Sequence, residues 1–244
     1  MPSDSLSVLA IGAHPDDLEL QCAGTLARYV QQGARVSMAI ATDGSAGHRS
    51  IPADELVAIR KQEAFQSASI LGVELHWLGY RDELLADDME TRLRFIELVR
   101  LTRPQVILTH HPQDYHPDHR SVSRLVFAAS FVAQLPNVHT GSPALEWIPA
   151  LYYFDNFSGV NFIPTEFVDI TSTFDIKRRM LACHKSQMTW RTDVLIGEER
   201  QEESLLEMIA VQSRFRGLQS GVAYAEGFTF ENVAPRLSTR RLLP

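Results

Sequence analysis

The chain has 244 residues, of which 45% are hydrophobic and 22% charged, as is typical of a globular protein with one large core. Its net charge of −7, from 30 acidic and 23 basic residues without a basic tract, excludes a protein that binds mainly the phosphate backbone of nucleic acids. Its two cysteines have no CxxC spacing, which excludes a disulfide framework.

The even composition predicts one domain over residues 1–244. No linker, low-complexity segment or internal repeat marks a boundary, although the patterns weaken over the last third, about 150–244. The amino-terminal apolar run follows no basic segment and soon ends in charged residues, and no later run is long enough to cross a bilayer. We therefore expect a cytoplasmic protein without a membrane partner.

Short apolar runs alternate along the chain with segments of helical periodicity. Uninterrupted apolar runs predict buried strands, and 3.6-residue periods closed by Gly or Pro predict helices. This alternation is typical of an α/β fold with a mostly parallel sheet covered on both faces. We expect strands at 6–13, 34–42, 73–79, 104–110, 150–157 and 165–170, and helices at 21–32, 53–71, 89–102, 118–133, 172–184 and 200–214.

Two similar polar motifs follow predicted strands: "HPDD" at 14–17 and "HPDH" at 116–119. In each, proline comes just after histidine, where the first turn of a helix tolerates it best. The first and last residues of each motif are three apart and share one face of a helical turn. Because ligands bind outside the carboxyl ends of parallel strands, we expect both motifs to meet at that edge of the sheet.

Two histidines and several carboxylates at one edge favour a metal site. A catalytic zinc takes three ligands of the His, Asp or Glu kind and keeps one position for water. It lowers the pKa of that water and polarises a carbonyl group, while a neighbouring carboxylate takes the proton. The first motif offers one acid to bind the metal and an adjacent acid to serve as the base.

Plainer explanations exist for each motif alone. Asp near a helix N-terminus is stabilised by the helix dipole without any metal, and the histidines of "THHPQDYHPDHR" could belong to a polar loop. Other functions stay open as well: a two-metal phosphoesterase, which would need more ligands at this edge, or a sugar-binding module without catalysis. A nucleotide-binding protein is disfavoured because neither GxGxxG nor GxxxxGK[ST] occurs.

At these residues the sequence resembles the PIG-L/LmbE-like family of zinc-dependent N-acetylglucosaminyl deacetylases. The resemblance covers residues 6 to about 230 and implies a Rossmann-like three-layer sandwich. It rests on "AHPDDLE" (13–19), "TDGSAGH" (42–48), "RKQEAFQSASILGV" (60–73), "LGYRD" (78–82), "HPDHRSV" (116–122), "CHKSQ" (183–187) and "YAEGF" (224–228).

The resemblance implies roles for five residues of the two motifs. His14, Asp17 and His119 match the metal ligands. Asp16 matches the general base that activates water, and His116 the histidine that stabilises the oxyanion or protonates the leaving amine. Zn²⁺ is the expected metal, although two histidines and a carboxylate also suit Fe²⁺.

The resemblance also implies residues around the metal. Asp118 matches an acid that orients the catalytic histidine, and Arg60 and Asp82 match positions that hold sugar hydroxyls. The expected reaction is hydrolysis of the acetamide of an N-acetylated amino sugar conjugate, by a chain that could form a homo-oligomer. The loops 43–53, 83–90 and 136–150, which set substrate choice in such enzymes, match no pattern.

Overall fold

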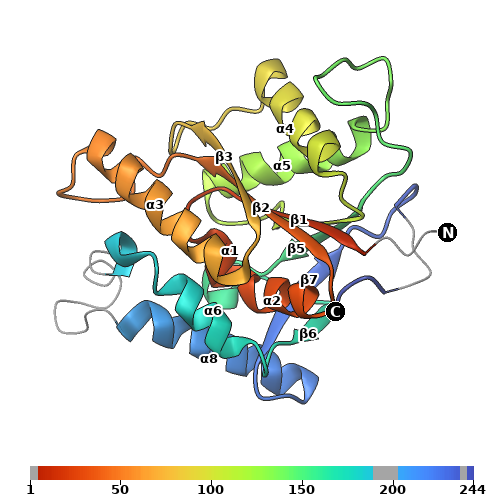
Figure 1. The fold of residues 1–244 in the computed structure, drawn as a ribbon. Coiled ribbons are helices and arrows are strands. Elements are labelled where there is room, and N and C mark those ends of the chain that lie inside the picture. The colour runs from red at the N-terminus through yellow and green to blue at the C-terminus, as the bar shows by residue number, and fades with distance from the viewer. Residues whose placement is uncertain (1–4, 189–202, 237–240) are drawn as a thin grey trace.

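The computed structural model describes residues 5–188, 203–236 and 241–244 (Figure 1). One seven-stranded sheet runs through it in the order β3-β2-β1-β4-β5-β7-β6. The first five strands of this order are mutually parallel, whereas β7 is antiparallel to both of its neighbours. The strands are β1 (Ser7–Gly12), β2 (Arg35–Thr42), β3 (Glu74–Tyr80), β4 (Val106–His110), β5 (Ala150–Phe154), β6 (Glu166–Asp169) and β7 (Ala225–Phe230).

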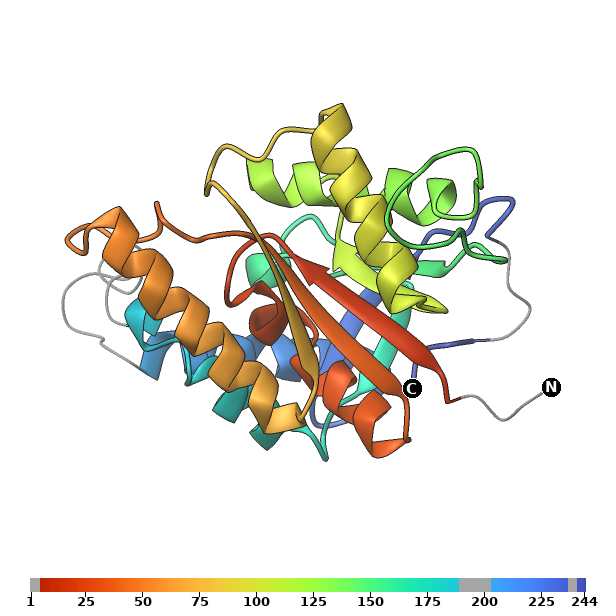
Figure 2. The ribbon, with the colours of Figure 1, turned by 45° about the horizontal axis from the view of Figure 1, so that its top comes forward.

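Helices cover both faces of the sheet, which gives the three layers expected of an α/β sandwich (Figures 1 and 2). One face carries α4 (Met89–Thr102) and α5 (Pro117–Val132). The opposite face carries α1 (Asp17–Gln21), α2 (Ala23–Gln31), α3 (Ala53–Leu71), α6 (Phe174–Leu181) and α8 (Glu203–Ser220). A short 3₁₀ turn, η1 (Phe157–Gly159), follows β5.

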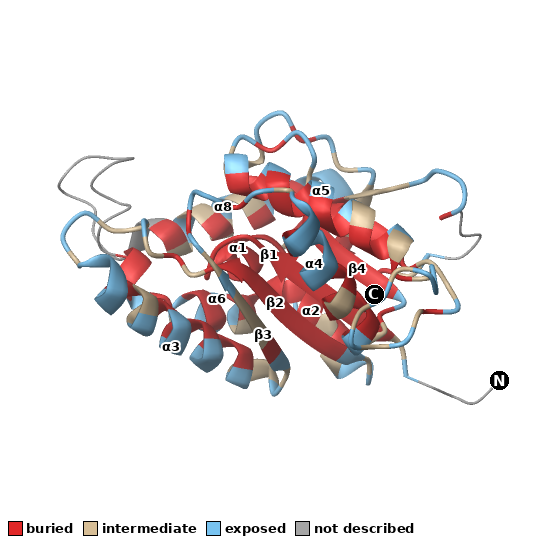
Figure 3. Cartoon of the chain, turned by 90° about the horizontal axis from the view of Figure 1, so that it is seen from above, coloured by how far each residue is buried: buried red, intermediate tan, exposed pale blue. Residues whose placement is uncertain are grey.

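The central strand β1 shows why two covering layers are needed. All six of its residues are buried, and Figure 3 shows the same burial along the neighbouring strands. Val8 and Ala10 pack into the core beneath α2, whereas Leu9 and Ile11 pack into the core beneath α4 and α5. Side chains alternate between the faces of a strand, so an uninterrupted apolar run needs apolar partners on both sides.

Local signals set the ends of several helices. Asp88 caps α4 by accepting the N–H of Thr91, at 2.9 Å. Gly72 ends α3 in the left-handed conformation (φ 65°), which glycine adopts without strain. Pro117 opens α5 at the first helical position, where its missing N–H is not needed.

The predicted elements differ from the structure mainly at the two ends of the chain. The helix expected at 21–32 corresponds to α2, and a further short helix, α1, precedes it and is separated from it at Cys22. The helix expected at 172–184 is shorter, and the one expected at 200–214 runs on to Ser220, with 200–202 outside the described residues. Strand β7 was not predicted as a strand. Its six residues include Gly227, and a side chain at this position would be too close to Pro164, because an added Cβ would lie 2.9 Å from the Cβ of Pro164.

No helix among the described residues combines the length and the apolar character needed to cross a bilayer. The parallel order of β1 and β4 places the residues that follow both strands at the same edge of the sheet. The HPDD motif follows β1 directly, and the HPDH motif begins six residues after β4 ends.

Candidate metal centre

The HPDD motif forms a tight turn between β1 and α1. Asp17 closes it twice: its N–H donates to the carbonyl of His14, and its Oδ2 accepts the N–H of His14 at 2.6 Å. Asp16, at φ 138°, lies in a backbone region that residues with a Cβ rarely adopt. Such strain is of order 1–3 kcal/mol and persists where surrounding contacts enforce it, as is common at functional sites.

Three side chains from the two motifs converge at the carboxyl edge, two imidazoles and one carboxylate. His14 Nδ1 lies 3.2 Å from His119 Nε2 and 3.3 Å from Asp17 Oδ2. His119 Nε2 lies 3.3 Å from Asp17 Oδ1. Ligands bound tetrahedrally at the usual zinc distances stand about 3.3 Å apart. The spacing and the donor set, two imidazoles with a carboxylate, therefore fit a divalent cation such as Zn²⁺.

The outer nitrogens of both rings face carboxylates. His14 Nε2 lies 3.1 Å from Asp82 Oδ1, and His119 Nδ1 lies 3.0 Å from Asp114 Oδ1. A carboxylate only accepts hydrogen bonds, so His119 carries a proton on Nδ1 and turns its Nε2 inward, while Asp82 and Asp118 flank the Nε2 of His14 and leave its Nδ1 on the inner side. Metal-binding histidines are commonly oriented in this way.

Electrostatics favours positive charge at this point. Burial lowers the pKa of the His14 imidazole, but the Asp17 carboxylate and hydrogen bonds to Asp118 and Asp82 raise it well above its ordinary value. His119 follows the same pattern, with Asp17 and Asp114 outweighing burial. Burial raises the pKa of the Asp17 carboxyl group, but the surrounding histidines outweigh it and hold that pKa well below the usual range. The acids thus stabilise a cation, as a proton on a ring or as a metal.

His110 is a third histidine at the site. It ends β4, stacks on His119 with the ring centroids 3.9 Å apart, and lies 3.2 Å from Asp17 Oδ2. Its Nε2 accepts the N–H of Ala13 at 3.0 Å, which ties the start of the HPDD turn to β4. Burial and the nearby His119 lower the pKa of His110 to about 4, so its ring is neutral near pH 7.

His116 caps helix α5 with its own ring. Its Nδ1 accepts the N–H of Asp118 at 3.2 Å, so the proton of the neutral ring lies on Nε2. That Nε2 points to Glu83 Oε1, 3.2 Å away. The ring centroids of His116 and His14 are 4.6 Å apart, so the Nε2–H donor stands beside the three converging ligand atoms.

The Asp118 carboxylate faces away from the ring that it was expected to orient. Its Oδ2 accepts the N–H of Glu83 at 2.9 Å and lies 3.5 Å from His14 Nε2. The contact between Asp118 and His116 is made through the backbone N–H of Asp118. The reason is that His116 occupies the N-cap position of α5, where a side-chain acceptor faces the first free N–H groups.

Arg60 lies behind Asp16 and is 1% exposed. Its guanidinium donates to the carbonyls of Pro15 (2.7 Å) and Gly44 (3.2 Å) and lies 3.3 Å from Asp16 Oδ1. A Cβ at Gly44 or Gly47 would come within 2.8 or 2.5 Å of this group. The two glycines of "TDGSAGH" therefore let the loop pack against Arg60, and Arg60 supports the strained turn at Asp16.

The structure thus brings together all eight of the predicted site residues, but with three neighbours that sequence reasoning missed. Asp114 orients His119, His110 packs against the ring of His119, and Glu83 faces His116. A partial signal existed, because Asp114 and His110 fall inside the histidine-rich segment 109–120. Glu83 gave none, since its position depends on how the loop after β3 folds over α5.

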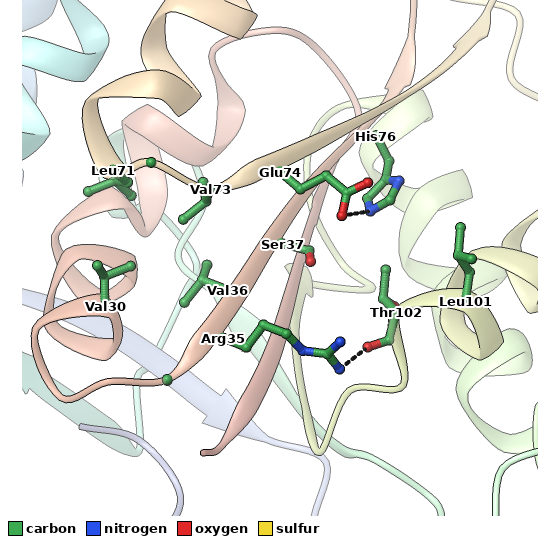
Figure 4. Close-up of a pocket in the computed structure, with 12 residues that line it drawn as sticks. Val30, Arg35, Val36, Ser37, Leu71, Val73, Glu74, His76, Leu101 and Thr102 are labelled. Carbon is green, nitrogen blue, oxygen red and sulfur yellow. Dashed lines mark hydrogen bonds and ion pairs between the residues drawn. The ribbon is translucent and has the colours of Figure 1, made fainter. Parts of the chain in front are cut away.

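A hollow of about 390 Å³ lies at the opposite edge of the sheet, around the amino ends of β2 and β3 (Figure 4). Arg35 there donates to the carbonyl of Thr102 at 2.8 Å, and His76 faces Glu74 at 3.7 Å. None of the ligand clusters found among the described residues lies in this hollow. The candidate site is therefore the histidine and aspartate cluster at the carboxyl edge.

Comparison with known proteins agrees with this geometry. The family model described as "PIG-L: GlcNAc-PI de-N-acetylase" matches residues 9–130, which include both motifs. A diacetylchitobiose deacetylase of Thermococcus kodakarensis is 32% identical over 93% of this chain and 84% of its own length. The chain belongs to the PIG-L family.

Solved structures of similar proteins extend the comparison to the whole fold. The N,N′-diacetylchitobiose deacetylase of Pyrococcus horikoshii, solved with an inhibitor, has a TM-score of 0.81 and 28% identity, covering 93% of this chain and 84% of that one. GalB, a 4-carboxy-2-hydroxymuconate hydratase of Pseudomonas putida, has a TM-score of 0.80 and 24% identity, covering 97% and 99%. The latter likeness shows the shared fold alone.

Proposed function

We propose that this PIG-L family chain is a metal-dependent N-deacetylase that removes the acetyl group from an N-acetylglucosamine-type amide. The observation that carries the proposal is the convergence of His14 Nδ1, His119 Nε2 and the Asp17 carboxylate within 3.2–3.3 Å of one another. Similarity to the Thermococcus deacetylase, which covers nearly the whole chain, supports the substrate class.

His14, Asp17 and His119 would hold the metal in this proposal. Zn²⁺ fits the spacing of the three atoms, and Fe²⁺ is the alternative because it also binds two histidines with one carboxylate. When bound, the cation would polarise the carbonyl of the acetamide and make water a better nucleophile. Asp82 and Asp114 would keep the two rings in the orientation that binds it.

Asp16 would act as the general base. The water oxygen attacks the carbonyl carbon while its proton passes to the Asp16 carboxylate. When the C–N bond breaks, the same proton can pass to the leaving nitrogen, which yields acetate and a free amine. Arg60 and the glycine loop support this role by holding the strained Asp16 turn in place.

His116 would stabilise the oxyanion by donating its Nε2–H. A second proton on the ring would need Nδ1, which already accepts the N–H of Asp118 as part of the helix cap. This contact favours hydrogen-bond donation over proton transfer to the leaving amine. Asp118 would then contribute through its backbone N–H, and through its carboxylate beside His14.

The predicted contacts of Arg60 and Asp82 with sugar hydroxyls stay proposals. Both residues are nearly buried, at 1% and 4% exposure of the whole residue, and both already contact protein groups at the site. In this account Arg60 and Asp82 act first as supports for Asp16 and His14.

An acetate-release assay tests the proposal. The protein, purified without chelator, is incubated with N,N′-diacetylchitobiose, N-acetylglucosamine and glycoside conjugates of N-acetylglucosamine, and free acetate is measured. We expect acetate from at least one of these, lost on chelation and restored by Zn²⁺ or Fe²⁺. Absence of acetate from a metal-loaded protein on the whole panel would contradict the proposed function.

A further inference from the structure

Glu83 occupies an unusual backbone position at the entrance of the site. It follows Asp82 in the loop after β3 and has a φ of 65°, in the left-handed region that favours glycine. The buried Asp118 carboxylate holds this conformation by accepting the N–H of Glu83 at 2.9 Å. A strained residue that a buried acid fixes in place suggests a function for its side chain.

The side chain of Glu83 lies between the histidines and water. Its carboxylate is 3.2 Å from His116 Nε2. A carboxylate oxygen of Glu83 also lies within 4.8 Å of a ring nitrogen of His14 and of a carboxylate oxygen of Asp82. The Glu83 side chain is 51% exposed, whereas that of His116 is 17% exposed. Glu83 is thus the outer acid of the cluster, and an incoming substrate meets its charge first.

The acids beneath Glu83 share this sign of charge. The side chains of Asp82 and Asp118 are each 2% exposed and face His14. Their charges are partly balanced by the histidines and would be balanced further by a metal. Glu83 faces Nε2 of His116, whose Nδ1 accepts the N–H of Asp118, so this ring offers Glu83 a hydrogen bond from Nε2–H rather than a full charge.

We propose that Glu83 is a specificity residue that selects uncharged or cationic N-acetylated amino sugars and rejects those bearing a phosphate or carboxylate near the amide. The proposal rests on the proposed function and refines its substrate class. A sugar hydroxyl or ammonium group would donate to Glu83 in place of His116, which frees the Nε2–H of His116 for the oxyanion. An anionic group would meet an unbalanced carboxylate at the entrance, a common means of rejecting a wrong partner.

The experiment compares matched substrates in the metal-loaded enzyme. For each substrate that releases acetate, kcat/KM is measured for the uncharged form and for a form phosphorylated next to the amide, such as N-acetylglucosamine and its 1-phosphate. We expect the wild type to prefer the uncharged form, and Glu83→Gln to reduce that preference about 3- to 10-fold, the size of a repulsion between two charges in a partly aqueous site. Added salt should reduce the preference of the wild type but not that of the variant.

Two further variants keep the test independent of folding and of net charge. Glu74→Gln removes the same charge from an exposed residue at the other end of β3 and should leave the preference unchanged. Glu83→Gly removes the side chain without backbone strain, so it should lose the preference with no lower melting temperature than Glu83→Gln. Equal effects of Glu83→Gln and Glu74→Gln, or a wild type that prefers the phosphorylated form, would overturn the proposal.

Failure of the proposed function can be told apart from failure of this inference. If no substrate releases acetate, the deacetylase proposal falls, and the charge selection is judged by calorimetric binding of inorganic phosphate to the metal-loaded protein. Phosphate should bind Glu83→Gln about 3- to 10-fold more tightly than it binds the wild type. Equal dissociation constants would overturn the role of Glu83.

Discussion

A carboxylate on the outer side of each candidate histidine ligand decides which ring nitrogen faces the metal position. Asp82 Oδ1 lies 3.1 Å from His14 Nε2, and Asp114 Oδ1 forms a hydrogen bond of 3.0 Å with His119 Nδ1. The two histidines therefore use different nitrogens, although they occupy related motifs. The reason is that His14 sits in the turn after β1, whereas His119 lies within helix α5.

Asp114→Asn tests the orientation of His119. The amide keeps the size of the side chain but removes its charge and can present an N–H to the ring, so His119 is held less firmly. We expect metal affinity to fall about 10- to 100-fold, as for other changes of groups that orient a ligand. Competition with a chromophoric chelator measures it directly. Asp87→Asn, which removes a charge from a pair with Arg92, is the matched control; equal losses in both variants would contradict the assignment.

Asp16→Asn and His119→Ala separate catalysis from metal binding. The first should keep a full complement of metal and lose turnover about 10²- to 10⁴-fold, because a base is removed while the ligands remain. The second should lose stoichiometric metal. Metal analysis and acetate release on the same samples check both. Full activity of Asp16→Asn, or tight metal binding by His119→Ala, would show that the roles are assigned to the wrong residues.

At the scale of elements, the segment after α6 joins several of the elements that surround the candidate site. Glu63 on α3 accepts the N–H and the hydroxyl of Ser186, and Gln187 donates to the carbonyl of Gly47. His184, fully buried, lies 3.4 Å from Glu19 of α1. The late "CHKSQ" segment therefore connects α1, α3 and the glycine loop.

The His184 and Glu19 pair predicts a pH dependence of stability. Burial lowers the pKa of His184, but Glu19 outweighs it and raises the pKa above the ordinary value of 6.5. The stabilisation is complete below that unfolded pKa and is lost as the pH rises through the higher folded pKa. His184→Gln should therefore reduce the free energy of unfolding more at pH 6 than at pH 9. Urea denaturation at both pH values checks this, and a constant difference would contradict it.

A second buried pair joins α6 to β7 and to the start of α2. Lys177 donates to Glu226 at 2.6 Å, and the Glu226 carboxylate also accepts the N–H groups of Gly24 and Thr25. Lys177→Met leaves an unbalanced buried carboxylate and should lower the free energy of unfolding by about 3–5 kcal/mol. Adding Glu226→Gln should restore part of it. Chemical denaturation measures this, with Lys185→Met as the control because Lys185 is exposed. A similar decrease in the free energy of unfolding of Lys185→Met would contradict the prediction.

At the scale of the whole molecule, six of the seven strands were predictable, β6 at the sheet edge included, whereas β7, which is antiparallel to both of its neighbours, was not. Strands such as 6–13 and 104–110 are continuous apolar runs, because both of their faces are buried. Strand β7 has no such run, since it pairs antiparallel with β5 and β6 and depends on contacts far apart in sequence. Local patterns therefore predict the fold class and the edge where the site lies, but not strand β7.

The same distinction applies to the site. That the HPDD and HPDH motifs meet could be predicted, because each follows a strand and the parallel sheet brings them together, whereas the choice of His14, Asp17 and His119 as ligands comes from the family resemblance. The supporting role of Arg60, and the contact of Asp118 with His116 through its backbone N–H, could not be predicted. Both depend on how loops from distant parts of the chain pack. Those loop contacts, rather than the motifs, separate one candidate role from another.

The central claim is that one metal ion, held by His14, Asp17 and His119, is needed for deacetylation. The most direct measurement titrates the metal-free protein with Zn²⁺ and records bound metal and acetate release from the same samples. We predict that the rate rises in proportion to occupancy and reaches its maximum at one metal per chain. Full activity without metal, or a rate that rises until two metals are bound, would contradict the account.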